Sequence, residues 1–362
     1  MNATGPSRLA LRVATLWAAV LIAGGATVPA AEPPGSSAPP SPARPAADWI
    51  RAGLNTNRPS WGVRGGLLWG LPAGGRRDDG PRGLIRLRYP VLTNGAYDLV
   101  NFIAIEPMVS GRRGFSELER SALDGVAGKR LVAANPESAA PAAPGLCPGE
   151  LTRLDSGAER LAVRVEVERF DNGAHLALTV TQRSDTPDEI ELTVHALPDS
   201  APLQFYILTA TMGNKARARQ LWLENEVVSS LKLYPGYKGY DFAPHRLFAL
   251  DRLHRTSAGE VLVALTTDEA DPSAVEPFPG RTHWRYAGFP VTQYWKKPAG
   301  TWRPGLEVAV NGRSTYWLSR QPIPGGIAFE NFEMREPFYE GQRFVFGMTR
   351  QSPSELGFRV RP

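Results

Sequence analysis

Three stretches of alternating apolar and polar residues lie between Leu161 and His195. The apolar residues stand at every second position, which is the period of a β-strand with one face in a core and one face in water. They are Leu161, Val163, Val165 and Val167, then Leu176, Leu178 and Val180, and then Ile190, Leu192 and Val194. Asp171-Asn172-Gly173 and the segment 185–188 separate the stretches with residues that favour turns. The pattern predicts an antiparallel meander that covers a core on one side.

The same pattern of short apolar runs and turn residues extends over the rest of the chain. Asn94-Gly95 and Asn311-Gly312 each separate two apolar runs, and both are read as turns between strands. The runs are Leu84–Leu92 and Tyr97–Glu106, Leu306–Val310 and Thr315–Leu318, with further strand candidates at Val261–Thr267 and Arg343–Thr349. The 36 glycines and 33 prolines suit frequent turns and disfavour helical bundles. We therefore predict an all-β fold, a large antiparallel sandwich or supersandwich with one or two short helices.

The best helix candidate is Asn214–Leu231, where apolar residues including Ala218, Trp222 and Val228 would share one helical face. Leu221 and Leu223 also alternate, so a strand stays an alternative there.

The first residues have the layout of a secretory signal peptide. Arg8 and Arg12 precede an apolar run from Val13 to Val28, and small residues up to Ala31 follow it. The run is about 16 residues long, short of the ~20 that a helix needs to span the hydrocarbon core. We predict cleavage after Ala30 or Ala31, export to the periplasm or the medium, and no stable membrane anchor after cleavage.

Composition divides the remainder of the chain. Residues 31–47 are mostly Pro, Ala and Ser and are predicted to be a disordered linker. Residues 48–362 are predicted to form a single sandwich domain, in which the Pro/Ala-rich stretch 134–149 is a flexible loop. Its Cys147 is the only cysteine, so no intramolecular disulfide can form and an apolar core must stabilise the fold.

The charge gives little reason to expect nucleic acid. The formal net charge is +5, and removing the two arginines of the signal peptide leaves about +3. Positive residues are also spread along the chain, as where Arg76-Arg77 is followed at once by Asp78-Asp79.

Aromatic and basic residues gather late in the chain. Flat rings that stack on the apolar faces of sugars, flanked by side chains that form hydrogen bonds, are what a carbohydrate site needs. The candidate ligand-binding residues are Trp284, Tyr294, Trp295, Lys296 and Trp302. The alternative is that these rings fill the core of the sandwich.

Two acidic segments supply candidate catalytic residues. If residues 330–336 form a strand, Asn331, Glu333 and Arg335 share one face, where an amide, a carboxylate and a guanidinium could grip a polyhydroxylated ligand. Glu106 closes an apolar strand and should need a cationic partner, which Arg112 or Arg113 could supply. A solvated face for the first segment and a purely structural ion pair for the second are the alternatives.

The five histidines show no metal-ligand spacing, so no metal and no cofactor is predicted. His245 follows a Tyr- and Gly-rich segment and is the candidate proton carrier. No P-loop, nucleophile elbow, HExxH, paired CxxC or dinucleotide fingerprint is present.

The run of short β signals, the late Trp/Tyr cluster and the closing segment FENFEMREPFYEGQRFVFGMTR give a layout that resembles the galactose-mutarotase-like β-sandwich. The resemblance covers roughly residues 50–350 and is architectural, without a diagnostic catalytic motif. It implies a carbohydrate ligand on a concave sheet, and it assigns no catalytic residue.

Three functions are open at this point. The first is an exported carbohydrate-binding or carbohydrate-processing protein in which Glu333, Glu106 and His245 converge with the aromatics in one cleft. The second is a sugar-binding module without catalysis. The third is a non-catalytic structural or interaction protein of the cell envelope, with the aromatics buried in its core.

Overall fold

The computed structural model describes residues 46–53, 59–72, 81–92, 94–134, 147–212, 217–269, 291–317 and 319–359, and the backbone of 275–278 and 281–287. Contacts divide the chain after Ala43, and everything below concerns the unit that begins at Arg44. The predicted signal peptide, most of the predicted linker and residues 135–146 of the predicted loop lie outside the described residues.

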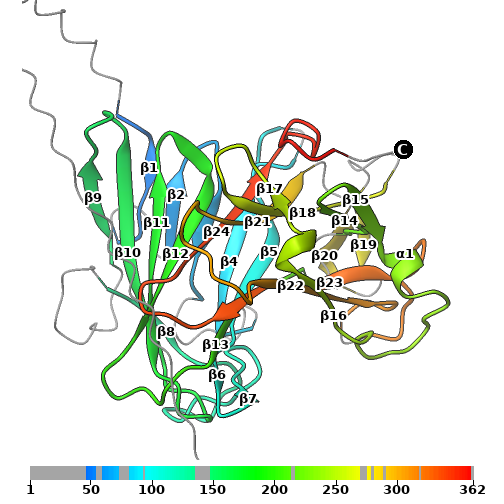
Figure 1. The fold of residues 1–362 in the computed structure, drawn as a ribbon, viewed down its shortest axis with the longest axis horizontal. Coiled ribbons are helices and arrows are strands. Elements are labelled where there is room, and N and C mark those ends of the chain that lie inside the picture. Colours follow the sequence, from blue (N-terminus) through cyan, green and yellow to red (C-terminus); the bar gives the residue numbers. More distant parts are fainter. Residues whose placement is uncertain are drawn as a thin grey trace, which may run out of the picture. The chain divides into compact units, whose positions relative to one another are not determined.

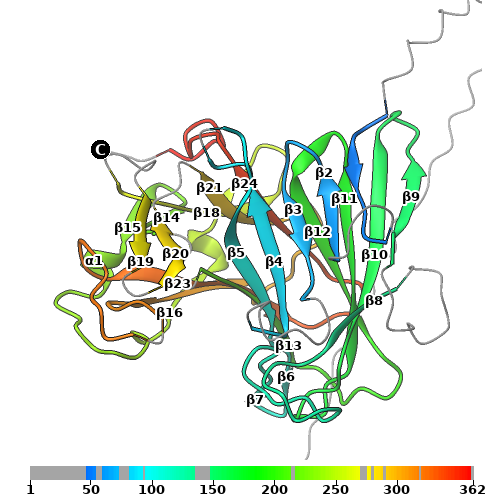
Figure 2. The same ribbon diagram turned by 180° about the vertical axis from the view of Figure 1, so that it is seen from behind.

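Antiparallel strands form two large sheets, which confirms the predicted all-β sandwich (Figures 1 and 2). Sheet I consists, in spatial order, of β1 (Trp49–Ile50), β2 (Ser60–Val63), β3 (Leu68–Gly70), β4 (Leu84–Tyr89), β5 (Asp98–Ile105), β13 (Phe205–Thr211), β23 (Ala328–Pro337), β22 (Glu307–Arg313) and β16 (Arg246–Ala249). A two-stranded ribbon, β6 (Met108–Val109) and β7 (Arg112–Arg113), attaches to it through β13.

Sheet II is built in the same way. Its spatial order is β15 (Glu226–Ser229), β14 (Gln220–Leu223), β18 (Val261–Thr266), β21 (Thr292–Lys297), β24 (Arg343–Thr349), β12 (Thr186–Ala196), β11 (Leu176–Arg183), β10 (Glu159–Val167) and β8 (Leu131–Ala134). Two short strands, β17 (His254–Arg255) and β9 (Glu150–Arg153), pair with β18 and β10. A separate hairpin consists of β19 (Val275–Phe278) and β20 (Arg281–Ala287).

The predicted meander is confirmed as β10, β11 and β12. Its register sets Val165 opposite Leu178 and Leu178 opposite Val194, so the apolar residues line up across the three strands. All three of these side chains are fully buried. Period-two alternation therefore aligns one apolar face against the core.

One apolar core lies between the two sheets. Phe332 and Met334 of sheet I and Trp295 and Phe346 of sheet II all belong to it and are fully buried. The indole Nε1 of Trp295 donates a hydrogen bond across the core to the carbonyl of Phe332, at 2.8 Å. This polar link satisfies the one polar atom of a buried Trp and fixes the sheets against each other.

The helix candidate over Asn214–Leu231 was wrong, and the strand alternative is confirmed. Where this segment is described, it forms a hairpin of β14 and β15, and only Ser230–Leu233 is helical (α1). A 3-10 turn, η2, follows at Leu250–Arg252. Asn225 adopts a φ of 59° at the hairpin turn, a conformation that Asn tolerates and a helix cannot contain.

The predicted turn at Asn311-Gly312 is instead part of β22. The register between β22 and β23 shifts between Val310 and Gly312, so the strand accommodates an irregularity and continues. A Cβ at Gly312 would lie 2.6 Å from the carbonyl oxygen of Ala328, so the glycine is required by the close approach of β23 and not by a turn.

Candidate functional site

The candidate site lies on the outer face of sheet I, the face turned away from the core. On β23, Phe332 and Met334 point into the core, so Glu333 between them points outward. The register places Thr209 of β13 beside Glu333 on one side and Ala309 of β22 beside it on the other. Glu333 is nevertheless only 1% exposed, because neighbouring side chains enclose it.

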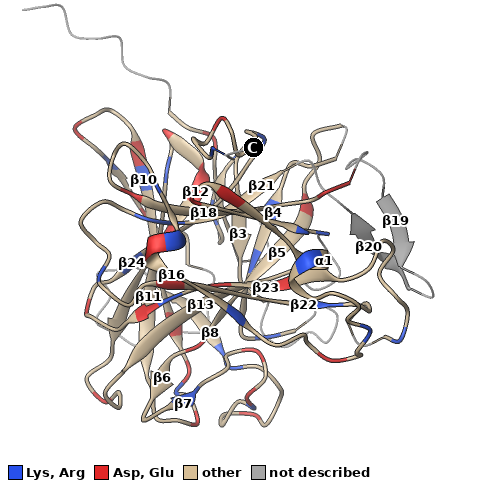
Figure 3. Cartoon of the chain, turned by 45° about the vertical axis from the view of Figure 1, so that its right-hand side comes forward, with Lys and Arg blue, Asp and Glu red and all other residues tan. Residues whose placement is uncertain are grey.

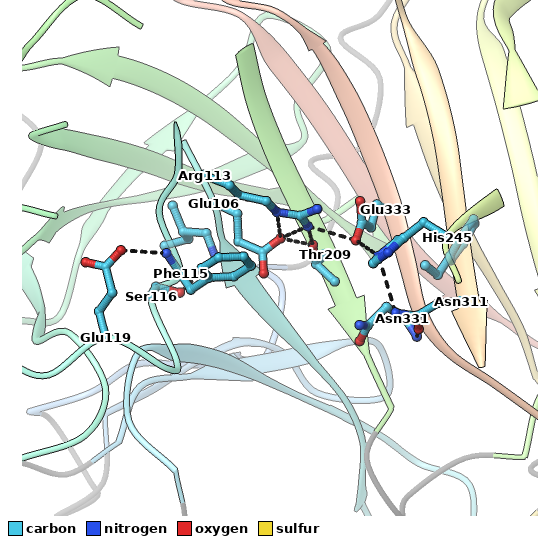
Figure 4. Close-up of polar contacts among 12 residues, drawn as sticks. Glu106, Arg113, Phe115, Ser116, Glu119, Thr209, His245, Asn311, Asn331 and Glu333 are labelled. Carbon is cyan, nitrogen blue, oxygen red and sulfur yellow. Dashed lines mark hydrogen bonds and ion pairs between the residues drawn. The ribbon is translucent and has the colours of Figure 1, made fainter. Parts of the chain in front are cut away.

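Arg113 reaches this carboxylate from the β6–β7 ribbon. Ser110 and Gly111 have φ values of 49° and 74° and reverse the chain, which returns Arg113 toward the end of β5. Its Nη2 donates to Glu106 and, at 2.8 Å, to Oε1 of Glu333. Figure 4 shows the guanidinium between the two carboxylates. The pairing of Glu106 with Arg113, one of the two predicted partners, is confirmed.

Thr209 completes the environment of Glu106. Its hydroxyl donates to Oε2, the same oxygen that Arg113 contacts. Glu106 itself follows β5 directly, and its backbone N–H donates to the carbonyl of Ile207 at 3.0 Å, which holds it against β13. A buried carboxylate is tolerated here because charged and hydroxyl donors replace the water it has lost.

His245 occupies the other side of Glu333. Its Nε2 lies 2.8 Å from Oε1 of Glu333 and 3.3 Å from Nδ2 of Asn311, and 43% of its side chain is exposed (Figure 4). Asn311 is itself fixed, because its Oδ1 accepts the backbone N–H of Asn331 at 3.2 Å. The imidazole is therefore the member of the cluster that combines a buried carboxylate partner with access to solvent.

The local backbone explains why His245 is held in place. The N–H of Ala243 donates to the carbonyl of Gly312 at 2.8 Å, so the segment before His245 lies against β22. Immediately after His245, β16 begins and pairs with β22, with Leu247 opposite Ala309. His245 is thus fixed from both sides to the strand that carries Asn311.

The two carboxylates have different electrostatic environments. Burial raises the pKa of Glu106, an effect that the neighbouring Arg113 only partly offsets. Burial also acts to raise the pKa of Glu333, but the hydrogen bond to His245 and the charge of Arg113 outweigh it, and the net shift is downward. Glu117, half-buried in the loop that follows, has its pKa raised to about 7 by burial and by the charge of Glu106. Glu333 is accordingly the ionised partner of His245 at neutral pH.

One atom of this cluster lacks a hydrogen bond. Oε2 of Glu333 is buried and has no hydrogen-bond partner in the part of the chain that the structure describes. An unsatisfied buried acceptor costs about 1–3 kcal/mol, so this oxygen lowers the stability of the folded protein.

The structure brings together the three predicted catalytic residues. Glu106, Glu333 and His245 are joined through Arg113 in one continuous set of contacts. Two predicted ligand-binding residues, Asn331 and Arg335, flank Glu333 on the same strand. Arg335 forms an ion pair with Glu307 of β22, at 3.4 Å.

The predicted aromatic residues are not brought to this cluster. Trp295 is buried in the core, while Tyr294 and Lys296 lie on the outer face of sheet II and contact Glu189. Alternation along β21 produces this split, because neighbouring residues of a strand point to opposite faces. The predicted cleft that unites them with the carboxylates is therefore not observed for these three residues.

The other two aromatic candidates also lie apart or undescribed. Trp302 is half-buried against the core, and its ring packs under the guanidinium of Arg255, 4.6 Å from the ring centroid. The side chain of Trp284, on β20, lies outside the described residues.

Sequence reasoning missed two members of the cluster. The pair Asn311-Gly312 predicts a turn, because Asn-Gly is the strongest short turn signal, and this hides Asn311 as a member of the cluster. Thr209 stands in an apolar strand with nothing to distinguish it from other strand threonines. Only the register of β22, β23 and β13 reveals either of them.

Comparison with models of known protein families gives no match, and no curated protein matches the chain. Among the described residues, no group of three or more His, Cys, Asp and Glu side chains is arranged to hold a metal ion. Within the same residues, no helix has the length and hydropathy to cross a membrane. Figure 3 shows acidic and basic residues interspersed along the strands and loops on the side it displays.

The geometry limits the chemistry that the cluster can perform. Glu106 and Glu333 are both bound to the same nitrogen of Arg113 and both are buried, so they do not flank an open space in the way that the two carboxylates of a glycosidase flank a glycosidic bond. The accessible group is His245. A histidine oriented by a buried carboxylate can accept or donate a proton at neutral pH.

Proposed function

We propose that the protein is exported and binds or processes carbohydrate at the outer face of sheet I, with His245 as its proton-transferring group. The observation that carries the proposal is the contact between the accessible imidazole of His245 and the buried carboxylate of Glu333, at 2.8 Å. Glu333 and Arg113 are positioning residues in this proposal. Glu106 acts through Arg113, which it orients.

The accessible polar groups around His245 favour a ligand that carries hydroxyl groups. The side chain of Asn331 is half-buried beside it, and its amide can both donate and accept, as recognition of a polyhydroxylated ligand demands. The sequence layout, which resembles that of galactose-mutarotase-like proteins, implies the same ligand class.

The reaction class follows from His245 being the accessible proton carrier of this cluster. Anomer exchange needs one such group: the imidazole takes the proton of the C1 hydroxyl and returns it to the ring oxygen, as the bond between C1 and the ring oxygen breaks and C1 becomes a carbonyl carbon. The reverse steps close the ring on the other face of C1. A displacement by a carboxylate nucleophile would need an exposed acidic oxygen, and both carboxylates are enclosed. We therefore propose anomer exchange in preference to glycoside hydrolysis.

The test is a proton NMR screen of the purified protein with a panel of neutral and acidic sugars, followed over time. It reports binding, anomer exchange, new double bonds and new reducing ends together. His245→Asn should abolish turnover, and Glu333→Gln should lower it while leaving the fold intact. The matched control is His195→Asn, because His195 lies on β12 of the other sheet and also pairs with a carboxylate, that of Glu340.

Two results would contradict the proposal. The absence of any binding or reaction over the whole panel would favour the non-catalytic envelope protein. Equal activity in wild type and His245→Asn would remove His245 from the reaction, whatever the substrate.

A further inference from the structure

Exposed aromatic side chains precede His245 in the chain. Tyr240 is 59% exposed and Phe242 is 37% exposed, and both belong to the segment that leads into His245. Exposed large apolar groups so close to a polar cluster are the arrangement of a binding site, because they supply contact area beside groups that fix orientation.

A buried arginine organises these rings. The guanidinium carbon of Arg313 lies 5.0 Å from the ring centroid of Phe242 and 5.0 Å from that of Trp317. The two rings are themselves 5.7 Å apart and tilted by 41°. Arg313 is fixed in turn, since it donates to the carbonyl of Tyr240 at 3.1 Å and to that of Thr315 at 3.3 Å. Phe242 and Trp317 are therefore a prearranged pair.

This aromatic pair is continuous with the His245 cluster. Arg313 stands two residues after Asn311 on β22, and Asn311 contacts His245. Phe242 stands three residues before His245, so their Cα atoms can be at most about 10 Å apart. A ligand of more than one sugar unit could contact both.

We propose that Phe242 and Trp317, with Tyr240 beside them, form an aromatic subsite that stacks on one ring of an oligosaccharide whose neighbouring ring lies at His245. This inference rests on the proposed function and adds the ligand's length.

The experiment measures dissociation constants by isothermal titration for neutral gluco-, galacto- and manno-oligosaccharides of increasing length, from the monosaccharide upward. The variants are Phe242→Ala and Tyr240→Ala, with Phe242→Tyr as the variant that keeps the ring. Leu151→Ala is the matched control, because Leu151 is 37% exposed like Phe242 and lies on β9 of the other sheet.

We expect wild type to bind oligosaccharides more tightly than the monosaccharide. Phe242→Ala should weaken oligosaccharide binding about 10-fold and leave monosaccharide binding unchanged, since one stacked ring is lost. Phe242→Tyr should bind like wild type. If Phe242→Ala and Tyr240→Ala bind oligosaccharides as wild type does, the subsite is wrong and the proposed function stands. If wild type binds no sugar of any length here and none in the NMR screen, both are wrong.

Discussion

Arg113 is the residue on which the electrostatic balance of the site depends, and Arg113→Met tests that balance directly. The substitution keeps much of the side-chain length and leaves the carboxylates of Glu106 and Glu333 without their shared cation. Breaking a buried ion pair from one side costs about 3–5 kcal/mol. We expect the lower end, about 3 kcal/mol of unfolding free energy at pH 7, because the contact between His245 and Glu333 and the hydrogen bond from Thr209 to Glu106 both remain.

The destabilisation caused by Arg113→Met should depend on pH. Without Arg113, burial and the charge of Glu333 both raise the pKa of Glu106, so its folded-state pKa lies above the unfolded value. A raised carboxyl pKa means that the folded state binds the proton more tightly, and the associated stability is present at low pH and lost as pH rises through the folded pKa. The difference between wild type and Arg113→Met should therefore shrink as the pH falls from 7 toward 4.

The assay is urea unfolding followed by intrinsic fluorescence at several pH values, read as changes in midpoint at constant slope. Arg112→Met is the matched control, because Arg112 lies beside Arg113 on β7 and is exposed. It should cost less than about 0.5 kcal/mol. If Arg113→Met costs no more than Arg112→Met, or costs the same at every pH, the cluster is not the buried charge network described above.

Three further predictions concern other parts of the fold. Lys297 is fully buried against Glu336, and burial lowers the pKa of Lys297 to about 8. Above pH 8 the unfolded chain therefore binds more protons than the folded chain, and the free energy of unfolding should rise with pH between about 8 and 10. This rise should be absent in Lys297→Met. Burial raises the pKa of the Cys147 thiol, so a thiol reagent at neutral pH should label it only under unfolding conditions, and rapid labelling of the native protein would contradict its burial. Gly83→Ala should destabilise the protein by at least about 1–3 kcal/mol in the same urea assay, because φ is +76° and the new Cβ would lie 1.8 Å from the carbonyl oxygen of Ser116. Gly95→Ala is the control, because φ is also positive at Gly95 but the space around it is open.

The sequence was sufficient for the fold class because alternation is a local signal. Leu161 to Val194 alternate within each strand, and one chain segment contains all the information needed to assign a face. The hairpin of β14 and β15 was harder, because its apolar residues also fit a helical period and only the pairing of Leu221 with Val228 decides between them. The turn predicted at Asn311-Gly312 was wrong for a similar reason, since a bulge and a turn use the same residue types.

The candidate site was predictable in its members and not in its contacts. Glu106, Glu333 and His245 could be chosen by residue type and position in their strands. That they meet around Arg113 depends on the order of strands in sheet I, where β5, β13, β23 and β22 lie side by side although they are distant in sequence. The predicted place of the aromatic residues was wrong because neighbours in sequence were assigned to one site. Trp295 and Tyr294 are adjacent in sequence and therefore point to opposite faces of one strand, and that strand belongs to the other sheet.

Whether the charged cluster serves the fold or a ligand can be decided by removing it as a whole. Buried ion pairs seldom stabilise a protein relative to well-packed apolar residues of similar volume, and replacing such a set is often neutral or stabilising by about 1–4 kcal/mol. The outer face of sheet I already holds an apolar group next to the cluster, formed by Leu84, Phe102 and Ala104. An apolar replacement of the three charged residues would extend it without leaving an unpaired charge, whereas Arg113→Met alone leaves both carboxylates without their shared cation.

We therefore expect the triple variant Glu106→Leu, Arg113→Met and Glu333→Leu to unfold at a urea concentration equal to or higher than that of wild type, and at a higher one than Arg113→Met alone. It should at the same time lose sugar binding and turnover, because His245 has lost its carboxylate partner. A triple variant that is less stable than Arg113→Met would show that the cluster holds sheet I together. That outcome would favour the structural protein over the carbohydrate-processing one, because the charges would then be retained for the fold.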